Sequence, residues 1–588
     1  MTQRAFTKHY TGRMRRSCCV RGFDTVTILG TWLLGAATGA CQVAAPGPVP
    51  VHIRVHAADK LGAFHPIWAY FGYDEPNYTY TPHGKKLVGE LGSLSPSPVY
   101  IRTHFLLATG NGKASLKFGS TNAYTEDAAG RPVYDWSLVD RIFDTYLQAG
   151  AKPFVEIGFM PQALSSKPEP YFGGEWIPGQ PNTGYSAGWS YPPTDYRKWG
   201  ELVYQWARHA AEKYGAREAA SWYWEVWNEP DISYWHGTPE EYNRLYDFAV
   251  DGVKRALPSA RVGGPASTGP SNAKAGAFLR QFLEHCASGR NEATGGTGSP
   301  LDFVTYHAKG SPKLVDGHVR MGLAKEARDV DEGLNILSAF PAFRQLPVVL
   351  SEADPEGCAA CSARIYPQNA YRNGALYAAY TAVMLKTIME LAGRRGMTVA
   401  GMLTWAFEFE DQPYFAGFRE LATNGVDKPV LNVFRMLGML GGDWVNVRSN
   451  GALPLSKILR EGVVDAPDID VMATRRPREL DILVWNYHDD DVTVDPVTIR
   501  LEIEALPELK TRVEEFRMDA SHSNAYASWQ KMGRPNHPTT AEQVQLEKSG
   551  MLEAMEPPAL RMDGSRPHNG MLDFTLPRQG VALFRLYW

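Results

Sequence analysis

Cysteine is scarce in this chain, which has 6 among 588 residues. Half of them lie in the first 45 residues, so the rest of the chain has only Cys286, Cys358 and Cys361. Cys358 and Cys361 form one CxxC motif without a second, and this argues against a four-ligand zinc site. In an oxidising compartment we expect a local disulfide that stiffens this loop, with redox catalysis as the weaker alternative.

The chain also lacks a strong charge of one sign and a long apolar run near its start. A formal net charge of -4 gives no electrostatic reason to expect nucleic acid as a partner. The apolar stretch at residues 26–40 is too short for a comfortable membrane span. We therefore predict neither a nucleic-acid partner nor a stable membrane span.

The first 45 residues read as a leader. Basic residues cluster from Arg13 to Arg21, the apolar stretch follows, and small residues and prolines come next. This order is typical of a cleaved signal peptide, so we expect a secreted or periplasmic protein. Cys41 directly follows Thr38-Gly39-Ala40, which leaves lipoprotein processing at Cys41 as an alternative.

The whole chain has the composition of a soluble globular protein, with 44% hydrophobic and 21% charged residues. Aromatic residues are plentiful, with 16 Trp and 28 Tyr. Flat rings stack on the C–H faces of sugars, which suits a carbohydrate binder, although large cores explain the same content equally well.

Between residues 58 and 440 one unit repeats: a short apolar run, a polar loop and an amphipathic stretch. Residues 137–147 show the helical spacing, with Ser137 as the expected N-cap and Gly150 as the stop. Strands alternating with helices imply parallel βα units, and eight of them imply an α/β fold, a closed (β/α)8 TIM barrel. The eight apolar runs are 67–73, 99–106, 152–159, 221–229, 260–266, 301–307, 346–352 and 399–407.

From residue 441 to 588 the pattern changes to β-like runs without long intervening helices. This predicts an accessory C-terminal β-sandwich, which the early run at 50–57 is expected to join. Residues 521–556 are polar and helix-prone, and we interpret them as an insertion. Three consecutive acids, Asp489 to Asp491, are read as a solvated turn rather than a calcium site, because no spaced ligand set accompanies them.

Two glutamates stand at the ends of predicted strands. Glu229 ends the fourth run inside Trp-Asn-Glu-Pro, and Glu352 ends the seventh. Because active sites of such barrels lie at the C-terminal strand ends, both acids reach the same rim, where a separation of about 5 Å is feasible. A single strand-end Glu is usually just solvated, but this pair favours glycoside hydrolysis. Glu156 is a competing carboxylate, and Glu225 is expected in a barrel-core ion pair.

These segments resemble glycoside hydrolase family 39, the family of β-xylosidases and α-L-iduronidase. The resemblance covers about residues 60–440 and rests on the two glutamate motifs together with Ile101-Arg-Thr-His-Phe, Lys152-Pro-Phe-Val-Glu-Ile-Gly-Phe-Met-Pro and Phe303-Val-Thr-Tyr-His-Ala-Lys-Gly. It implies that Glu352 is the nucleophile and Glu229 the acid/base of a retaining enzyme that needs no metal or organic cofactor. An oligosaccharide or glycoside is then the expected substrate.

The resemblance also implies further substrate-binding residues. Arg102 matches an arginine that supports the nucleophile, although a buried structural salt bridge fits it as well. Asn228 is expected to bind the sugar 2-hydroxyl. Trp405 is expected to form a platform under the sugar, with a plain core Trp as the alternative. The remaining candidates are two histidines that would bind hydroxyls and one distal acid, namely His104, His307 and Glu410, for which Asp411 is an alternative.

Substrate choice is where two readings compete. Lys309 resembles the lysine that binds the substrate carboxylate in α-L-iduronidase, and Glu352-Ala-Asp354-Pro leans the same way. Met160-Pro, Trp405-Ala-Phe and the acidic Glu410-Asp411 pair look more like β-xylosidases. We predict an exo-acting β-xylosidase, with a uronic-acid-releasing enzyme or a non-catalytic sugar-binding barrel as alternatives.

Overall fold

The computed structural model describes residues 50–172, 176–177, 187–507 and 510–588. All of these belong to one unit of the chain. The predicted signal peptide at 1–45 and the lipoprotein alternative at Cys41 lie outside the described residues. Among the helices in the described ranges, none combines the length and apolarity that crossing a bilayer requires.

Eight parallel strands close into a barrel in the order β12-β13-β2-β3-β6-β7-β8-β9. Each strand overlaps one of the eight predicted runs, so the predicted (β/α)8 barrel is confirmed. The strands are β2 Tyr70–Tyr73, β3 Tyr100–Thr103, β6 Lys152–Ile157, β7 Tyr223–Val226, β8 Arg261–Ser267, β9 Phe303–Lys309, β12 Val348–Asp354 and β13 Val399–Trp405.

The barrel interior is a packed core. Tyr70, Phe154, Tyr223 and Phe303 point inward and form one apolar cluster, while residues such as Val155 face outward into the core beneath the helices. Parallel strands that are buried on both faces read as near-continuous apolar runs, which is why runs rather than strict alternation identified them. Because the interior is filled, a substrate site must lie at the strand ends.

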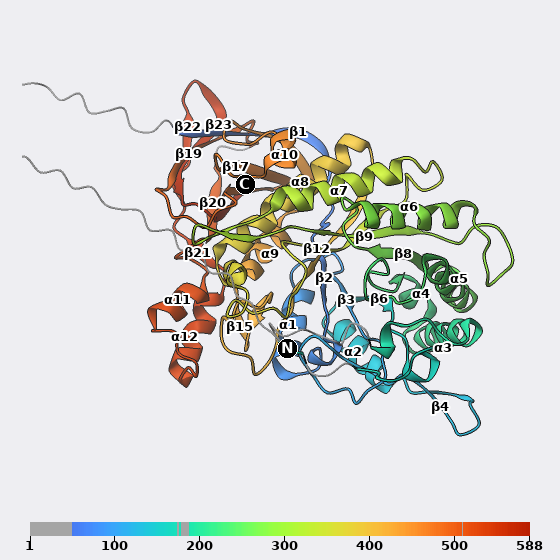
Figure 1. Cartoon of the computed structure of the whole chain (residues 1–588). Helices are drawn as coiled ribbons and strands as arrows, with labels where there is room; N and C mark the ends of the chain where they lie inside the picture. The colour runs from blue at the N-terminus through green and yellow to red at the C-terminus, as the bar shows by residue number, and fades with distance from the viewer. Residues whose placement is uncertain (1–49, 173–175, 178–186, 508–509) are drawn as a thin grey trace, which may run out of the picture. The chain divides into compact units, whose positions relative to one another are not determined.

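Helices surround the barrel (Figure 1). In α5 the Thr238 hydroxyl accepts from the Glu241 N–H, and the Glu241 carboxylate accepts from the Thr238 N–H, a capping box that defines where the helix begins. The predicted N-cap Ser137 is instead the first residue of its helix, because Trp136 occupies the cap position. The barrel helices are α1 Pro82–Gly92, α2 Ser137–Gln148, α3 Tyr196–Tyr214, α4 Ala216–Ala220, α5 Pro239–Ala256, α6 Ala273–Ser288, α7 Leu323–Ser338, α8 Ala375–Arg395 and α9 Pro429–Met439.

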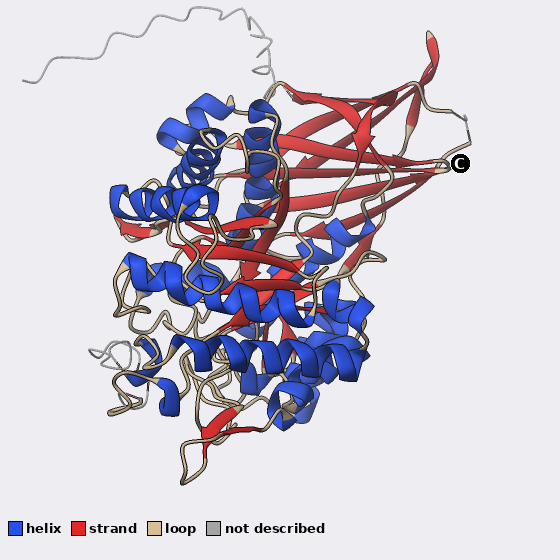
Figure 2. Ribbon diagram, turned by 90° about the vertical axis from the view of Figure 1, so that its right-hand side faces the viewer, coloured by secondary structure: helices blue, strands red, loops and turns tan. Residues whose placement is uncertain are grey.

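A ten-stranded sheet, which we call the β-domain, gathers beside the helices of the barrel (Figure 2). The early strand β1 (Val51–Ala63) lies in its middle, antiparallel to β16 and parallel to β19. In sheet order the strands are β21 Glu553–Met555, β20 Arg512–Met518, β24 Gly580–Tyr587, β18 Glu479–Tyr487, β17 Asp468–Arg476, β16 Asp443–Ser449, β1, β19 Val497–Glu504, β23 Arg566–Leu576 and β22 Arg561–Asp563.

The sheet curls over its own apolar face. Phe574 of β23 and Phe584 of β24 lie with their ring centroids 4.7 Å apart, although five strands separate β23 from β24 in the sheet. Side chains along β18 alternate between the two faces of the sheet. Ile482 and Val484 face the apolar core inside the curled sheet, and Trp485 faces the core that the sheet shares with the barrel. One continuous sheet thus provides both layers of the predicted sandwich.

Residues 519–552 interrupt the β-domain with two helices, α11 (Ala525–Lys531) and α12 (Thr540–Gly550). We call this segment the helical insertion. It packs on the loop that follows β13, where Phe415 and Val426 share a buried cluster with Ala525 and Leu546. Shorter elements are β4 Tyr124–Glu126, β5 Pro132–Tyr134, β10 Lys313–Val315, β11 His318–Arg320, β14 Ala422–Thr423, β15 Val426–Asp427, α10 Leu455–Glu461 and the 3-10 helices Pro76–Tyr78, Gln162–Leu164, Gly188–Ser190 and Pro367–Asn373.

Candidate active site

The two strand-end glutamates meet at one rim of the barrel. A carboxylate oxygen of Glu229, one of Glu352 and a ring nitrogen of His307 all lie within 4.8 Å of one another. The Glu352 side chain is only 6% exposed, and that of Glu229 is 16% exposed, so both acids are largely shielded from solvent. Glu229 beyond the end of β7, His307 of β9 and Glu352 of β12 thus converge on one place at the rim.

A strained turn carries Glu229 into this space. Trp227 and Glu229 both have positive φ, at 72° and 44°, which non-glycine residues rarely adopt. The Glu229 N–H donates to the Ala266 carbonyl at 2.9 Å, and the Trp227 N–H donates to the Ile157 carbonyl at 3.2 Å. These bonds to the two neighbouring strands hold a backbone conformation that costs free energy by itself, as is common at functional sites.

A β-bulge in β12 re-aims Glu352. Leu350 pairs with Tyr306 and Glu352 pairs with His307, so Ser351 is an extra residue in the ladder. A bulge shifts the direction of the side chains that follow it. As a consequence, Glu352 and His307 lie side by side at the rim, and Asp354 lies beside Lys309.

Arg102 lies beneath the two glutamates and is fully buried. Its guanidinium contacts Glu225 at 2.6 Å, Glu156 at 2.9 Å and Glu352 at 3.4 Å. Burial works against its charge, but these carboxylates, led by Glu225, raise the pKa of Arg102 above its usual value. The predicted ion pair of Glu225 in the barrel core is thereby confirmed, and Arg102 is both a structural ion-pair partner and a neighbour of Glu352.

Asn228 is oriented by the same arginine. The Arg102 Nη2 donates to the Asn228 Oδ1 at 3.0 Å, and the asparagine side chain is almost completely buried. An amide whose oxygen is occupied in this way keeps its NH2 group as a donor.

Lys309 is the nearest cation to Glu352. Its ammonium donates to Glu352 Oε2 at 2.6 Å and to Asp354 Oδ2 at 2.7 Å. Burial opposes ionisation of Glu352, but the positive charges facing it, first among them Lys309, hold the pKa of its carboxyl well below the usual range. Burial likewise disfavours the ammonium, yet Asp354 and Glu352 raise the pKa of Lys309, so the pair is ionised.

His307 contacts the other glutamate. Its Nδ1 lies 2.9 Å from Glu229 Oε1 and 3.9 Å from Glu352 Oε1. Within the described residues its buried Nε2 has no hydrogen-bond partner. The imidazole therefore positions Glu229 through Nδ1, while its second nitrogen is buried.

His104 and Trp405 form a second layer. His104 Nδ1 lies 2.5 Å from Glu156 Oε2, its Nε2 lies 3.3 Å from Asp74 Oδ1, and its ring packs 4.3 Å from that of Trp405. Burial and then Arg102 lower the pKa of His104 well below its usual value, so the ring is neutral. Trp405 is 1% exposed, and its Nε1 donates to Asp74 at 3.2 Å. Little of its ring surface is therefore open for the predicted stacking with a sugar.

Glu410 lies apart from this group. Its Oε1 accepts from the N–H of His83 in the first turn of α1 at 2.5 Å, where a carboxylate also suits the positive end of the helix dipole. Only its second oxygen remains for the predicted contact with a distal hydroxyl. Asp411, the alternative, is exposed in the same loop.

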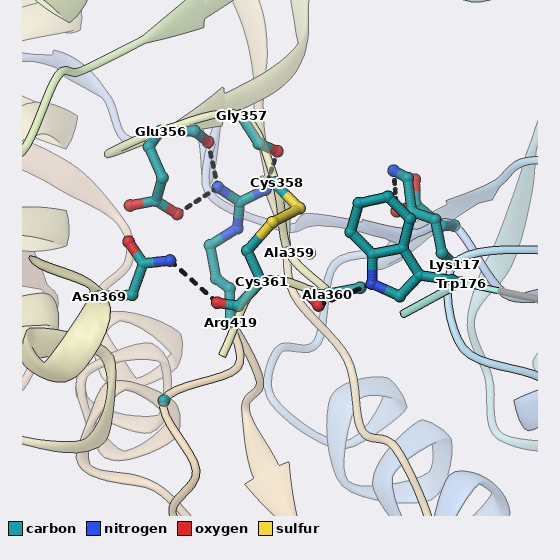
Figure 3. The surroundings of a disulfide bond; sticks show 12 residues. Lys117, Trp176, Glu356, Gly357, Cys358, Ala359, Ala360, Cys361, Asn369 and Arg419 are labelled. Carbon is teal, nitrogen blue, oxygen red and sulfur yellow. Dashed lines mark hydrogen bonds and ion pairs between the residues drawn. A yellow bond between two sulfur atoms is a disulfide. The ribbon is translucent and has the colours of Figure 1, made fainter. Parts of the chain in front are cut away.

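The predicted disulfide is confirmed: Cys358 and Cys361 are joined in the loop that follows β12 (Figure 3). Arg419 fastens this loop, with Nη1 donating to Glu356 Oε1 at 2.7 Å and Nη2 to the Gly357 carbonyl at 3.2 Å. On the other side, Trp176 Nε1 donates to the Ala360 carbonyl at 3.0 Å. The loop beyond Glu352 is therefore covalently and electrostatically braced.

Glu156 was expected only as a competing carboxylate and Asp354 only as part of the Glu352 motif, and their ion-pair partners were not predicted. Asp74 was not predicted at all. Asp354 had a detectable signal, because Glu352 and Asp354 are two residues apart in a strand and share one face. Asp74 follows β2 directly, at the same rim as the glutamates. Their partners lie from 30 residues (Asp74 and His104) to 331 residues (Asp74 and Trp405) away in the chain, and no local pattern identifies such pairs.

Comparison with known proteins shows the family to which this chain belongs. Residues 51–571 match Glycosyl hydrolases family 39. A β-xylosidase from Caldicellulosiruptor saccharolyticus is 26% identical over 426 residues, which are 71% of this chain and 76% of that protein. The α-L-iduronidase of Mus musculus is 25% identical over 393 residues, 61% of this chain and 58% of that protein.

A solved structure shows the same fold. The GH39 β-xylosidase from Caulobacter crescentus superposes with a TM-score of 0.67 and 22% identity, over 91% of this chain and 100% of that one. The family match spans most of the chain, including both glutamate motifs and most of the β-domain. The chain therefore belongs to glycosyl hydrolases family 39 and is a glycoside hydrolase.

Proposed function

We propose that this enzyme is a retaining exo-glycosidase that removes terminal β-D-xylosyl residues from xylo-oligosaccharides, with Glu352 as nucleophile and Glu229 as acid/base. The observation that carries the proposal is the approach of the two carboxylates, an oxygen of each lying within 4.8 Å of the other. Retaining glycosidases hold their carboxyl groups about 5–5.5 Å apart, whereas inverting enzymes need about 6.5–9.5 Å to admit a water.

In the first step a carboxylate oxygen of Glu352 attacks the anomeric carbon. The bond from that carbon to the leaving oxygen breaks, and the Glu229 proton passes to this oxygen, so a covalent glycosyl-enzyme and a free alcohol result. In the second step Glu229 takes a proton from water as the water oxygen attacks the same carbon. The bond to Glu352 breaks, and the sugar leaves with its original configuration.

The electrostatics support this division of labour. Lys309 and Arg102 hold the pKa of Glu352 low, so a carboxylate is present to attack at neutral pH. Glu229 has a histidine rather than a cation as its nearest partner. The free NH2 of Asn228 is placed to donate to the sugar 2-hydroxyl, a contact that strengthens in the transition state.

A neutral xyloside fits the site better than a uronide. The Lys309 ammonium already donates to two carboxylates, Glu352 and Asp354. Only one of its three N–H donors therefore remains for a carboxylate on the substrate. The β-xylosidase relative also matches a larger share of this chain than the mouse iduronidase does, 71% against 61%. Release of a uronic acid is the second candidate, because Lys309 resembles the lysine that binds the substrate carboxylate in α-L-iduronidase.

Two further expectations accompany this function. The basic and apolar leader supports export, so we propose that the enzyme acts on glycans in the periplasm or outside the cell. No step of the two-glutamate mechanism requires a metal or an organic cofactor.

The test is a panel of 4-nitrophenyl glycosides assayed with the full-length enzyme. We expect rapid release from the β-D-xyloside and little or none from the α-L-iduronide, and ¹H NMR should show β-xylose as the first product. A preference for the iduronide would favour the second candidate, and α-xylose as first product would exclude the retaining mechanism. Failure to cleave any glycoside would leave only a sugar-binding barrel.

A further inference from the structure

A pocket of about 1280 Å³ lies over the C-terminal face of the barrel. Its walls come from the loops after β12, β13, β2, β3 and β6, which are five consecutive strands in barrel order, and from the helical insertion of the β-domain. Neither Glu229 nor Glu352 is among its lining residues. Sites for drug-sized ligands occupy about 300–1,000 Å³, so this pocket has room for more than one sugar ring.

The insertion supplies an aromatic wall. Tyr526 and Trp529 of α11 stack with centroids 5.8 Å apart and planes at 24°, and both contact Phe415, at 5.4 and 5.2 Å. Phe415 is buried, whereas Tyr526 and Trp529 are only partly so and line the pocket. Flat, partly exposed rings that are fixed from behind are the surfaces on which sugar C–H faces stack.

This wall is held in place before any ligand binds. Asn432 at the start of α9 donates to the carbonyls of Ser523 and Gly550, at 3.0 and 2.7 Å, which bracket the insertion. Trp529 Nε1 donates to the Pro535 carbonyl at 3.0 Å, and this bond holds the chain that follows α11 against the Trp529 ring. The ordering cost of binding is therefore low.

Polar groups face the same pocket. Asp411 and Arg534 are exposed, line the pocket and have positive φ, at 60° and 62°. Phe415, which also lines the pocket, has positive φ at 49° as well. Strained non-glycine residues gathered at one pocket indicate a site. Charges of both signs beside rings suit a hydroxyl-rich neutral ligand and disfavour a lipid or a polyanion.

We infer that this pocket binds further sugar residues of the substrate glycan, beyond the one that is cleaved, and that the helical insertion of the β-domain therefore takes part in substrate selection. The inference rests on the proposed function for its reaction but not for its binding chemistry. Because the proposed exo action cleaves a terminal residue, the further residues belong to the leaving-group side of the cleaved bond, and the products test this placement.

The experiment compares kcat/KM for xylohexaose with kcat/KM for 4-nitrophenyl β-D-xyloside, which cannot reach the pocket beyond one ring. We expect Trp529→Ala to lose about ten-fold on the hexaose and less than about three-fold on the aryl glycoside, since one stacked ring contributes about that much. Trp529→Phe should restore most of the loss. Arg534→Ala, at an exposed residue whose removal leaves the core intact, should also lose more on the hexaose.

Val544→Ala is the matched control, because Val544 is 61% exposed on α12 of the same insertion and lies outside the pocket. It should behave as wild type on both substrates. Release of xylose as the only small product places the further residues on the leaving-group side. Xylobiose or longer products would overturn this placement, because they require further sugars on the non-reducing side and contradict the proposed exo action.

Equal effects of Trp529→Ala and Arg534→Ala on both substrates would overturn the inference while leaving the proposed function intact. If the wild-type enzyme cleaves nothing, the proposed function fails instead. Titration calorimetry of xylohexaose with the wild type and Trp529→Ala then decides the pocket separately: weaker binding by the variant supports it, and equal or absent binding rejects it.

Discussion

The two sides of the active site use the same side chain in opposite surroundings. On the β12 side, Glu352 is buried against Lys309 and Arg102 at 2.6 and 3.4 Å. On the β7 side, Glu229 is more exposed, stands on a strained turn and has His307 at 2.9 Å as its partner. The β12 side is built to keep a negative charge, whereas among the described residues no lysine or arginine forms an ion pair with Glu229 on the β7 side.

This difference teaches that environment rather than residue type assigns catalytic roles. A nucleophile must be ionised before the reaction begins, whereas an acid/base must exchange a proton twice in each cycle. The charges around the two glutamates separate these tasks across a distance of less than 5 Å. Substitutions that remove or exchange the surroundings of one side should therefore have effects that the other side does not show.

The largest effect is expected from Glu352→Gln. The amide cannot attack the anomeric carbon, so kcat on the β-xyloside should fall by at least about 10⁴-fold. Steady-state kinetics measure this, and Glu390→Gln on the exposed side of α8 is the control that should retain full activity. Residual activity within ten-fold of wild type would refute the role of Glu352 as nucleophile.

Glu229→Ala should lose about 10²–10⁴-fold, which is the usual contribution of general acid–base catalysis. Azide should rescue this variant, because the anion needs no base, and the product should be the β-glycosyl azide with retained configuration. In Glu352→Ala the azide should instead replace the nucleophile and give the α-azide. ¹H NMR distinguishes the two, and identical azides from both variants would contradict the assignment.

Lys309→Met should shift the pH profile and lower activity less than either glutamate variant. The ammonium holds the pKa of Glu352 below its usual range, so without it the carboxyl takes up its proton at a higher pH. The acidic limb of kcat/KM should then move to higher pH. Lys213→Met, which removes a surface ion pair with Asp140 and Asp144, should leave that limb in place. An unmoved limb in Lys309→Met would show that Lys309 does not set the charge of Glu352.

The smallest effect is expected from Cys358→Ser combined with Cys361→Ser. This disulfide closes a loop of only a few residues, so its loss should lower the free energy of unfolding by about 2 kcal/mol, as judged by chemical denaturation. The bonds of Arg419 to Glu356 and Gly357 remain and should keep the loop near its place. Because these bonds remain, kcat should fall by a few-fold at most. A loss of kcat as large as that of Lys309→Met would mean that the disulfide positions Glu352, the residue that the loop follows.

The strand pattern was readable from the sequence because parallel strands buried on both faces must be apolar throughout. The glutamates were readable because strand ends of a barrel share one rim. The bulge at Ser351 was not, since it depends on how β12 pairs with β9. Without it, Glu352 would keep plain alternation with Leu350 and would not lie beside His307.

The acidic run from Asp489 to Asp491 also shows what the sequence could not predict. A solvated turn was predicted, but Asp489 is buried, accepts from the Tyr487 hydroxyl at 2.6 Å and has its pKa raised by burial to about 7. Asp490 pairs with Arg320, 170 residues earlier in the chain. The ion-pair partner of Asp490 comes from another element of the fold, so the residues around position 489 do not predict it.

By itself the sequence determined the barrel, the identity of its two strand-end acids and the disulfide loop, because each follows from periodicity, strand order or local spacing. Only the tertiary structure decided that Lys309 serves Glu352 rather than standing free, that Trp405 is covered, and that the helical insertion reaches the mouth of the barrel. The physical reason is that charge and exposure depend on neighbours in space, and the chain brings those neighbours together only when it folds.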